Sequence, residues 1–342
     1  MAYRVSAKVA KQGQFIRPNG QGRKENIDMQ DTVNGFDTPM LGLSRDEWLT
    51  QLEQVAETNG YFQPLGKRHW ATLVEDKPVL LVTFETIDSI QKRGDTGHPL
   101  GWELVRELGW SHLCILSDGD TWFRDPEVIA YFDRLSDDGF FDEFDEVVFY
   151  GAGSCGYAAA AFSIVAEDAQ VVAIRPQATL SPRLAGWDKR FPKTRKIAFD
   201  GQYGFAPDMA AVADRCFVIY DPKQSFDAIH AALFARENTV LLPTPNLGMN
   251  PEEDLLDMQI LYRVLVKAGA GTLSPAAFYK LYRARRAYVP YLDRILRKVS
   301  QKKRPFMTAL LCANVARRLR EPRYLRHLDA LAQEAEQGRL AS

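Results

Sequence analysis

Six short apolar runs, separated by amphipathic stretches, constrain the fold of this chain more than any other feature of its sequence. The runs read PVLLVTF, HLCILS, EVVFYG, QVVAIRP, CFVIYD and TVLLP, and they fall at residues 78–84, 112–117, 146–151, 170–176, 216–221 and 239–243. Segments of helical period lie between most of them, such as DPEVIAYFDRLSDDG and SFDAIHAALFARE. Strands that are apolar on both faces and alternate with helices are typical of a parallel sheet with helices on both sides. The sequence therefore predicts an α/β protein with a doubly wound, mostly parallel sheet.

The segments on either side of this series have a different composition. Residues 1–70 are polar and rich in turn residues, with one helical stretch, SRDEWLTQLEQVAETNG, in which Ser44 suits a helix N-cap. Beyond residue 250 the strand signal stops, and four stretches of helical period follow. We therefore expect an N-terminal extension over residues 1–70, the α/β domain over 71–250 and a helical module over 251–342.

The composition is that of an ordinary globular protein. The 342 residues are 46% hydrophobic and 25% charged, which is enough apolar material for a full core. No run approaches the roughly 20 apolar residues that span a bilayer, and the first residues lack the apolar core of a signal peptide, so we expect a cytoplasmic protein. The four cysteines are scattered, and no GxxxxGK[ST] loop or HExxH motif is present. We expect no disulfide, no metal and no bound cofactor.

Charge is unevenly distributed along the chain. Residues 251–342 contain 18 Lys or Arg against 9 Asp or Glu, although the whole chain has a net charge of −1. Such a basic segment either holds an anionic ligand or docks on the acidic remainder of the chain, and both explanations stay open. A small molecule or a glycan, anionic ones included, is the expected substrate, whereas nucleic acid is not expected.

The stretch YGAGSCGYAAAAF, which joins the third apolar run to an Ala-rich helix, carries the strongest functional signal. With Ala152 two residues before it and Gly156 two residues after it, Ser154 fits a nucleophile elbow, a strained strand-to-helix turn that presents a hydroxyl above the sheet. Small residues are needed on both sides because the strand and helix backbones nearly touch there. In that arrangement the amide of Cys155 is one oxyanion donor, and the second comes from the turn after the first run, around Phe84.

A dinucleotide fingerprint is a competing interpretation of the same glycines. The sequence Gly151-x-Gly153-x-x-Gly156 has the required spacing. The next run ends in Arg175 instead of the acidic residue that binds the ribose of NAD, so the match would be to an NADP-binding protein. A glycine-rich turn that serves only packing is a third interpretation.

On these residues the chain resembles the α/β-hydrolase superfamily, and more loosely its branch associated with capsular and surface-polysaccharide biosynthesis. The resemblance covers about residues 71–250 and rests on PVLLVTFETI, HLCILSDGDTWF, YGAGSCGYAA and CFVIYDP. It implies a serine hydrolase or acyl-transfer enzyme in which Ser154 is the nucleophile and Asp221, at the end of the fifth run, is the acid.

The histidine of such a triad is the missing part. The loop after the last run, where the superfamily places it, reads PTPNLGMN, with Asn246 and no histidine. Among the five histidines of the chain, His98 lies in the loop after the oxyanion strand and is the candidate base. Because a serine without a base is a poor nucleophile, a non-catalytic relative linked to surface-polysaccharide metabolism is the alternative hypothesis. In either case we expect the basic helices, including Arg285 and Arg286, to face the mouth of the Ser154 site.

Overall fold

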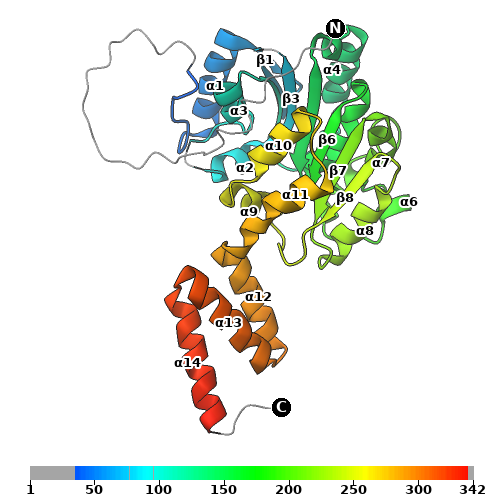
Figure 1. Ribbon diagram of the computed structural model, residues 1–342. Helices are drawn as coiled ribbons and strands as arrows, with labels where there is room; N and C mark the ends of the chain where they lie inside the picture. The colour runs from blue at the N-terminus through cyan, green and yellow to red at the C-terminus, as the bar shows by residue number, and fades with distance from the viewer. Residues whose placement is uncertain (1–34, 77, 95, 338–342) are drawn as a thin grey trace, which may run out of the picture. The chain divides into compact units, whose positions relative to one another are not determined.

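The core of the protein is one eight-stranded sheet (Figure 1), seen in a computed structural model that describes residues 35–76, 78–94 and 96–337. The strands lie in the order β1-β2-β4-β3-β5-β6-β7-β8. Their bounds are β1 Gly60–Pro64, β2 His69–Val74, β3 Val79–Thr86, β4 Ser111–Ser117, β5 Glu146–Ala152, β6 Gln170–Ile174, β7 Arg215–Tyr220 and β8 Thr239–Pro243. Strand β2 pairs antiparallel with both of its neighbours, and the other described pairs are parallel. The predicted doubly wound, mostly parallel sheet is confirmed.

Helices cover both faces of this sheet. Successive residues of β5 enter different cores, with Val147 and Phe149 on one face and Val148 and Tyr150 on the other, which is why the strands read as continuous apolar runs. The first face is covered by α4 (Pro126–Asp137), α5 (Ser154–Phe162), α7 (Ala206–Met209) and α8 (Ser225–Leu233). The second is covered by α1 (Arg45–Asn59), α2 (Ile87–Lys92), α3 (Trp102–Leu108), α9 (Pro251–Asp257), α10 (Leu261–Gly269) and α11 (Pro275–Tyr282).

The sheet begins earlier in the chain than the sequence indicated. Strand β1 and the start of β2 lie within the segment predicted as an extension, and Ser44 caps helix α1 with its side chain, as expected. These strands are short, and GYFQP and HWATLV mix aromatic with polar residues, so neither produces a long apolar run. The remaining part of the predicted extension, residues 1–34, lies outside the described residues.

The C-terminal region is helical, as predicted, but its helices pack in two different ways. In Figure 1 helices α9 to α11 lie over the sheet, and α10 shares a core with β5 and β6. Helices α12 (Val289–Gln301), α13 (Pro305–Leu319) and α14 (Pro322–Glu336) instead build a small core of their own. The predicted domain boundary at residue 250 stays a prediction.

Two further features bear on the sequence expectations. All four cysteines, Cys114, Cys155, Cys216 and Cys312, are free thiols in buried positions, where they pack as small hydrophobes. Within the described residues, no helix is both long enough and apolar enough to cross a bilayer.

Helix α5 is buried along nearly its whole length. Its alanines, Ala158 to Ala161, and the flanking Tyr157 and Phe162 have no exposed surface. A helix that is apolar on all sides belongs in a protein interior, and the small alanines let it lie close to β5 and β6. This packing fixes the turn that leads from β5 into α5.

Candidate functional site

The turn between β5 and α5 consists of one residue, Gly153. Its backbone angles are φ 61° and ψ −123°, whereas Ser154 is already the first residue of the helix. Residues other than glycine adopt a positive φ of this kind only at the cost of strain, and a nucleophile elbow places its nucleophile at that strained position. The strained residue is therefore Gly153, one residue before Ser154, at which the sequence analysis expected it.

Strand β5 and helix α5 approach each other closely on both sides of this turn. A β-carbon on Gly151 would lie 2.2 Å from the carbonyl oxygen of Cys155, and one on Gly156 would lie 3.0 Å from the carbonyl oxygen of Gly151. Gly151 lies two residues before Gly153 and Gly156 lies three residues after it, so both glycines that allow no free β-carbon flank the turn. Ala152, which the sequence analysis placed in this role, precedes the turn as the last residue of β5.

The two predicted oxyanion donors, the amides of Cys155 and Phe84, both lie within regular elements. Cys155 is the second residue of α5, two residues after the strained Gly153, whereas an elbow uses the amide directly after its strained residue. Phe84 lies within β3, opposite Ile115 in the β-ladder, and its ring stacks on Phe132. Its amide therefore belongs to the strand and not to the turn that follows.

Asp221, the predicted acid, directly follows β7, and its carboxylate accepts hydrogen bonds from backbone amides. Oδ1 accepts a hydrogen bond from the amide of Lys223 at 2.8 Å, and Oδ2 accepts one from the amide of Gly248 at 2.9 Å. Gly248 belongs to the loop after β8, where a triad histidine would stand. The carboxylate thus holds this loop directly, without an imidazole between them.

Side chains of α12 hold the same loop from its other side. Asn246 has a left-handed backbone, with φ 68°, and its side-chain oxygen accepts a hydrogen bond from Lys298 Nζ at 2.6 Å. Its carbonyl oxygen accepts one from Arg294 Nε at 3.2 Å. Arg294 and Lys298, two cations of the basic region, therefore hold the loop after β8 in place. Arg285, another cation of this region, lies over the ring of Tyr282, three residues before it.

The ring of His98, the candidate base, contacts Thr38 and Trp102. Its Nε2 donates to the carbonyl oxygen of Thr38 at 2.6 Å, and its ring contacts Trp102, with 5.1 Å between ring centroids. Burial is the main cause that lowers the pKa of His98 below its ordinary value. All five histidines lie in the described part of the chain, and none of them hydrogen-bonds to Ser154 or Asp221.

A cation that the triad prediction did not use lies beside the turn. Arg175 follows β6, and its Nη2 lies 3.5 Å from the point where a β-carbon on Gly153 would stand. Its Nη1 donates to the carbonyl oxygen of Met249 at 2.6 Å, and among the described residues no carboxylate forms an ion pair with it. Burial lowers the pKa of Arg175, and Asp227, from a distance, opposes this shift. In the sequence analysis, Arg175 has a role only in the dinucleotide interpretation, where it replaces the acidic residue that binds the ribose of NAD.

A buried ion pair lies at the end of β3. The carboxylate of Glu85 contacts the guanidinium of Arg93 and accepts a hydrogen bond from the amide of Leu100 at 3.0 Å. Burial alone would raise the pKa of Glu85, but the charge and hydrogen bond of Arg93 lower it below its ordinary value. The sequence analysis missed this pair because Glu85 lies in a strand, whereas Arg93 follows the short helix α2.

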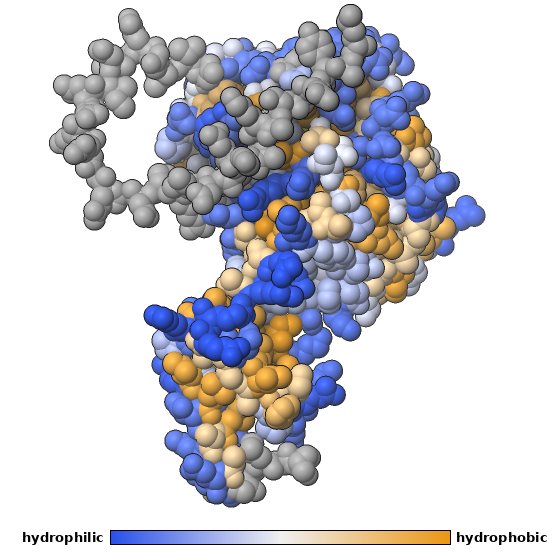
Figure 2. All heavy atoms as spheres, viewed as in Figure 1, coloured by the Kyte–Doolittle hydropathy of each residue, from blue (hydrophilic) through white to orange (hydrophobic). Residues whose placement is uncertain are grey.

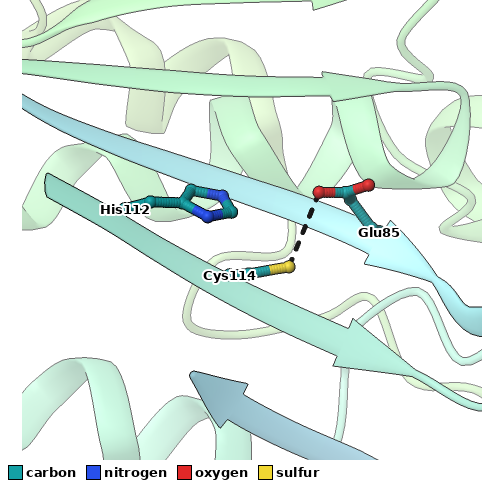
Figure 3. Close-up of side chains that lie close together, drawn as sticks. All are labelled: Glu85, His112 and Cys114. Atoms are coloured by element: carbon teal, nitrogen blue, oxygen red, sulfur yellow. Dashed lines mark hydrogen bonds between the residues drawn. The ribbon is translucent and has the colours of Figure 1, made fainter. Parts of the chain in front are cut away.

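Glu85 also belongs to the one cluster of the described residues whose side chains resemble a metal-ligand set (Figure 3). Donor atoms of Glu85, His112 and Cys114 lie within 4.8 Å of one another, and all three residues are buried. The hydroxyl of Thr83 lies 2.8 Å from both Glu85 Oε1 and His112 Nε2, and Cys114 Sγ donates to the same Oε1 at 3.6 Å. Oε1 already accepts several hydrogen bonds, and these contacts join β3 to β4, while the buried Nδ1 of His112 has no hydrogen-bond partner.

The sheet order, the antiparallel second strand and the turn after the fifth strand together define the α/β-hydrolase fold. The elbow follows β5, beside the boundary between β3 and β5 from which successive connections leave in opposite directions, and this is the usual place for a ligand site in such a sheet. The fold that the resemblance implied is confirmed.

No family model matches the chain, and no curated protein matches it. Among solved structures, it is similar to the capsule O-acetyltransferase of Neisseria meningitidis serogroup A, with 10% sequence identity and a TM-score of 0.40 over 60% of this chain and 94% of that one. It is also similar to carboxyl esterase 2 of the fungus Tuber melanosporum, with 14% identity and a TM-score of 0.35 over 53% of this chain and 72% of that one. A third similar structure is the Glycosylation Associate Protein (Gap123) complex of Streptococcus agalactiae, with 11% identity and a TM-score of 0.38 over 58% of this chain and 44% of that one.

Proposed function

We propose that this chain is a non-catalytic protein of the α/β-hydrolase fold that binds an anionic small molecule or glycan at the elbow. The observation that carries the proposal is the strained backbone of Gly153, which holds the position of a nucleophile without a side chain. The neighbouring Ser154 lies within the helix, where no histidine contacts its hydroxyl, so it lacks the base that a serine nucleophile needs.

The ligand class follows from Arg175. A partly buried guanidinium without a carboxylate partner in the described structure has lost water and gained only one carbonyl contact, so it gains most from an anion. A carboxylate or a phosphate group fits the two-pronged geometry of arginine. The proposed ligand is therefore a small molecule with such a group, an acidic or phosphorylated sugar in the first place.

A fluorophosphonate probe, which labels activated serines, tests the absence of catalysis. We expect the wild-type protein and Ser154→Ala to show the same background labelling. Labelling of the wild type that Ser154→Ala abolishes would establish the alternative, a serine hydrolase or acyl-transfer enzyme that uses Ser154, and would overturn the proposal.

Ligand titration tests the second half of the proposal. Glucuronate, glucose 1-phosphate and NADP⁺ form the panel, with neutral glucose as the reference, and binding is measured by calorimetry. Replacement of Arg175 by Gln removes a charge-assisted hydrogen bond and should weaken anion binding on the order of tenfold or more. The control Arg183→Gln removes an exposed arginine of the short helix α6 (Pro182–Ala185) and should have no effect.

The pattern of binding decides between the remaining interpretations. Tight binding of NADP⁺ alone, lost in Arg175→Gln, would support the dinucleotide fingerprint over a sugar site. Equal binding of all anions by the wild type and Arg175→Gln would show that Arg175 does not hold the ligand.

A further inference from the structure

Helices α12 to α14 carry an apolar surface that nothing in the described structure covers. Their own core takes the inward side chains, among them Leu296, Cys312 and Tyr324. At the start of α13, however, Phe306 is 76% exposed, Met307 46% and Leu310 56%. Figure 2 shows this apolar surface in orange over the C-terminal helices, bordered by hydrophilic side chains in blue.

These side chains form one patch. Residues four positions apart in a helix lie one above the other, so Phe306 and Leu310 share a face of α13 with Met307 at its edge. Leu325 of α14 is exposed as well. Single exposed apolar residues are ordinary, but several neighbouring ones at a helix start indicate an interaction site.

Cations immediately precede the patch in the chain. Lys302, Lys303 and Arg304 form the turn between α12 and α13, and all three are exposed. Within the described residues none of them forms an ion pair. The patch of Phe306, Met307 and Leu310 and this cationic turn are together called the α13 tip.

We propose that the α13 tip binds the surface of an anionic lipid bilayer. Phe306, Met307 and Leu310 enter the boundary between headgroups and acyl chains, while the cationic turn contacts the lipid phosphates. This combination of an apolar helix face and basic residues is the one that holds a helix in a membrane interface, and each basic residue near an anionic leaflet adds attraction. The binding is peripheral and independent of any ligand at the elbow.

Charge decides between a bilayer and other partners. In a second copy of this chain the same turn of three cations would meet its own equivalent, and like charges across an interface repel. Nucleic acid would satisfy the cations but would leave Phe306 and Met307 against a polar backbone, because protein–nucleic acid interfaces are largely polar. An anionic bilayer offers both negative charge and an apolar interior.

Vesicle co-sedimentation with the full chain is the direct test. We expect the protein to sediment with phosphatidylcholine vesicles that contain phosphatidylglycerol, and to remain in the supernatant with phosphatidylcholine alone. Added salt should weaken the binding, because it screens exposed charges. Equal binding to both kinds of vesicle, or none to either, would overturn the proposal.

Two pairs of substitutions locate the contact. The double variant Phe306→Ser/Met307→Ser should lose nearly all binding, while Leu184→Ser, at a leucine that is 54% exposed on α6, serves as the matched control and should bind like the wild type. Lys302→Gln/Lys303→Gln should weaken binding by about fivefold for each charge removed, whereas Lys67→Gln/Lys280→Gln, at exposed lysines elsewhere, should not.

Folding and self-association are checked on the same variants. Circular dichroism and thermal melting of Phe306→Ser/Met307→Ser should match the wild type, since both residues are exposed. Unchanged vesicle binding by this folded variant would overturn the proposal. So would sedimentation equilibrium that shows a wild-type dimer which the same variant dissociates, because the tip would then be an interface between two copies.

Discussion

The elbow after β5 and the loop after β8 lie at the same edge of the sheet, yet different interactions hold them in place. At the elbow the backbone geometry is intact, but Gly153 supplies no side chain. The loop after β8 carries Asn246, and the amide of its Gly248 donates a hydrogen bond to Asp221, which follows β7. The difference shows that the packing of strand against helix fixes the elbow, whereas hydrogen bonds to side chains fix the loop.

Substitution of Gly151 by Ala should produce the largest loss of stability. The added β-carbon would lie 2.2 Å from the Cys155 carbonyl oxygen, so strand and helix must separate, at about 3 kcal/mol of unfolding free energy. Gly153→Ala is the matched variant, because its β-carbon meets only Arg175 Nη2, at 3.5 Å, and it should cost only backbone strain, about 1–2 kcal/mol. Guanidinium denaturation measures both. A larger loss at Gly153 than at Gly151 would show that strain, and not contact, defines the elbow.

Acid should destabilise the protein through histidines that are part of the core. Burial lowers the pKa of His69 and His112 to about 4, from an ordinary value of 6.5. The unfolded chain therefore takes up protons first, so the contribution of each histidine to stability is complete above pH 6.5 and is lost as the pH falls towards 4. At about pH 5 the loss is about 2 kcal/mol for each.

Urea denaturation at neutral pH and at pH 5 measures this dependence. The variant His112→Gln should lose less unfolding free energy between the two pH values than the wild type does. The difference should be about 2 kcal/mol, the contribution of one histidine. An identical pH dependence in this variant would mean that His112 does not titrate as its burial indicates.

Asp221→Asn should weaken the loop after β8. An amide has only one acceptor oxygen, so the amide of Lys223 or that of Gly248 loses its partner, at about 1–2 kcal/mol of unfolding free energy. The control Asp137→Asn changes an exposed carboxylate and should cost under about 0.5 kcal/mol. Equal effects of the two variants would show that Asp221 does not organise the loop.

Lys298→Met should have the smallest effect on stability and act locally. It removes the hydrogen bond to the Asn246 side chain, at roughly 1 kcal/mol or less. Hydrogen exchange of the amides in residues 244–249 should become faster, while exchange in β5 and α5 is unchanged. The control Lys280→Met, at an exposed lysine, should alter neither. Faster exchange at the elbow as well would show that the two regions are not independent.

The sequence predicted the sheet because its strands are buried on both faces and leave a continuous apolar signal. It also located the elbow correctly between β5 and the Ala-rich helix, but it placed the centre of the turn on Ser154 because serine is the residue with chemistry. The backbone angles place the turn at Gly153, and Gly151, which allows no β-carbon, lies two residues before it. The frame Gly151-x-Gly153-x-Cys155 was present in the sequence beside the frame around Ser154.

The contacts that decide the candidate site could not be predicted in this way. The bond from Gly248 to Asp221 and the approach of Arg175 to Gly153 join residues that are more than twenty positions apart. Periodicity describes which face of an element is buried, but it does not specify which polar atoms meet at the ends of strands. Likewise, the sequence places His98 in a suitable loop, and only the fold shows that its ring donates a hydrogen bond to the carbonyl oxygen of Thr38.

The glycine at the top of the elbow also makes this protein a natural starting point for design. Placing a backbone in a strained conformation is the harder part of building an active site, and here that conformation already exists with space for a β-carbon. Gly153→Ser would therefore place a hydroxyl at the strained position of the turn. The two carboxylate oxygens of Asp221 already accept hydrogen bonds from the amides of Lys223 and Gly248, so a serine placed at the turn would still need a base.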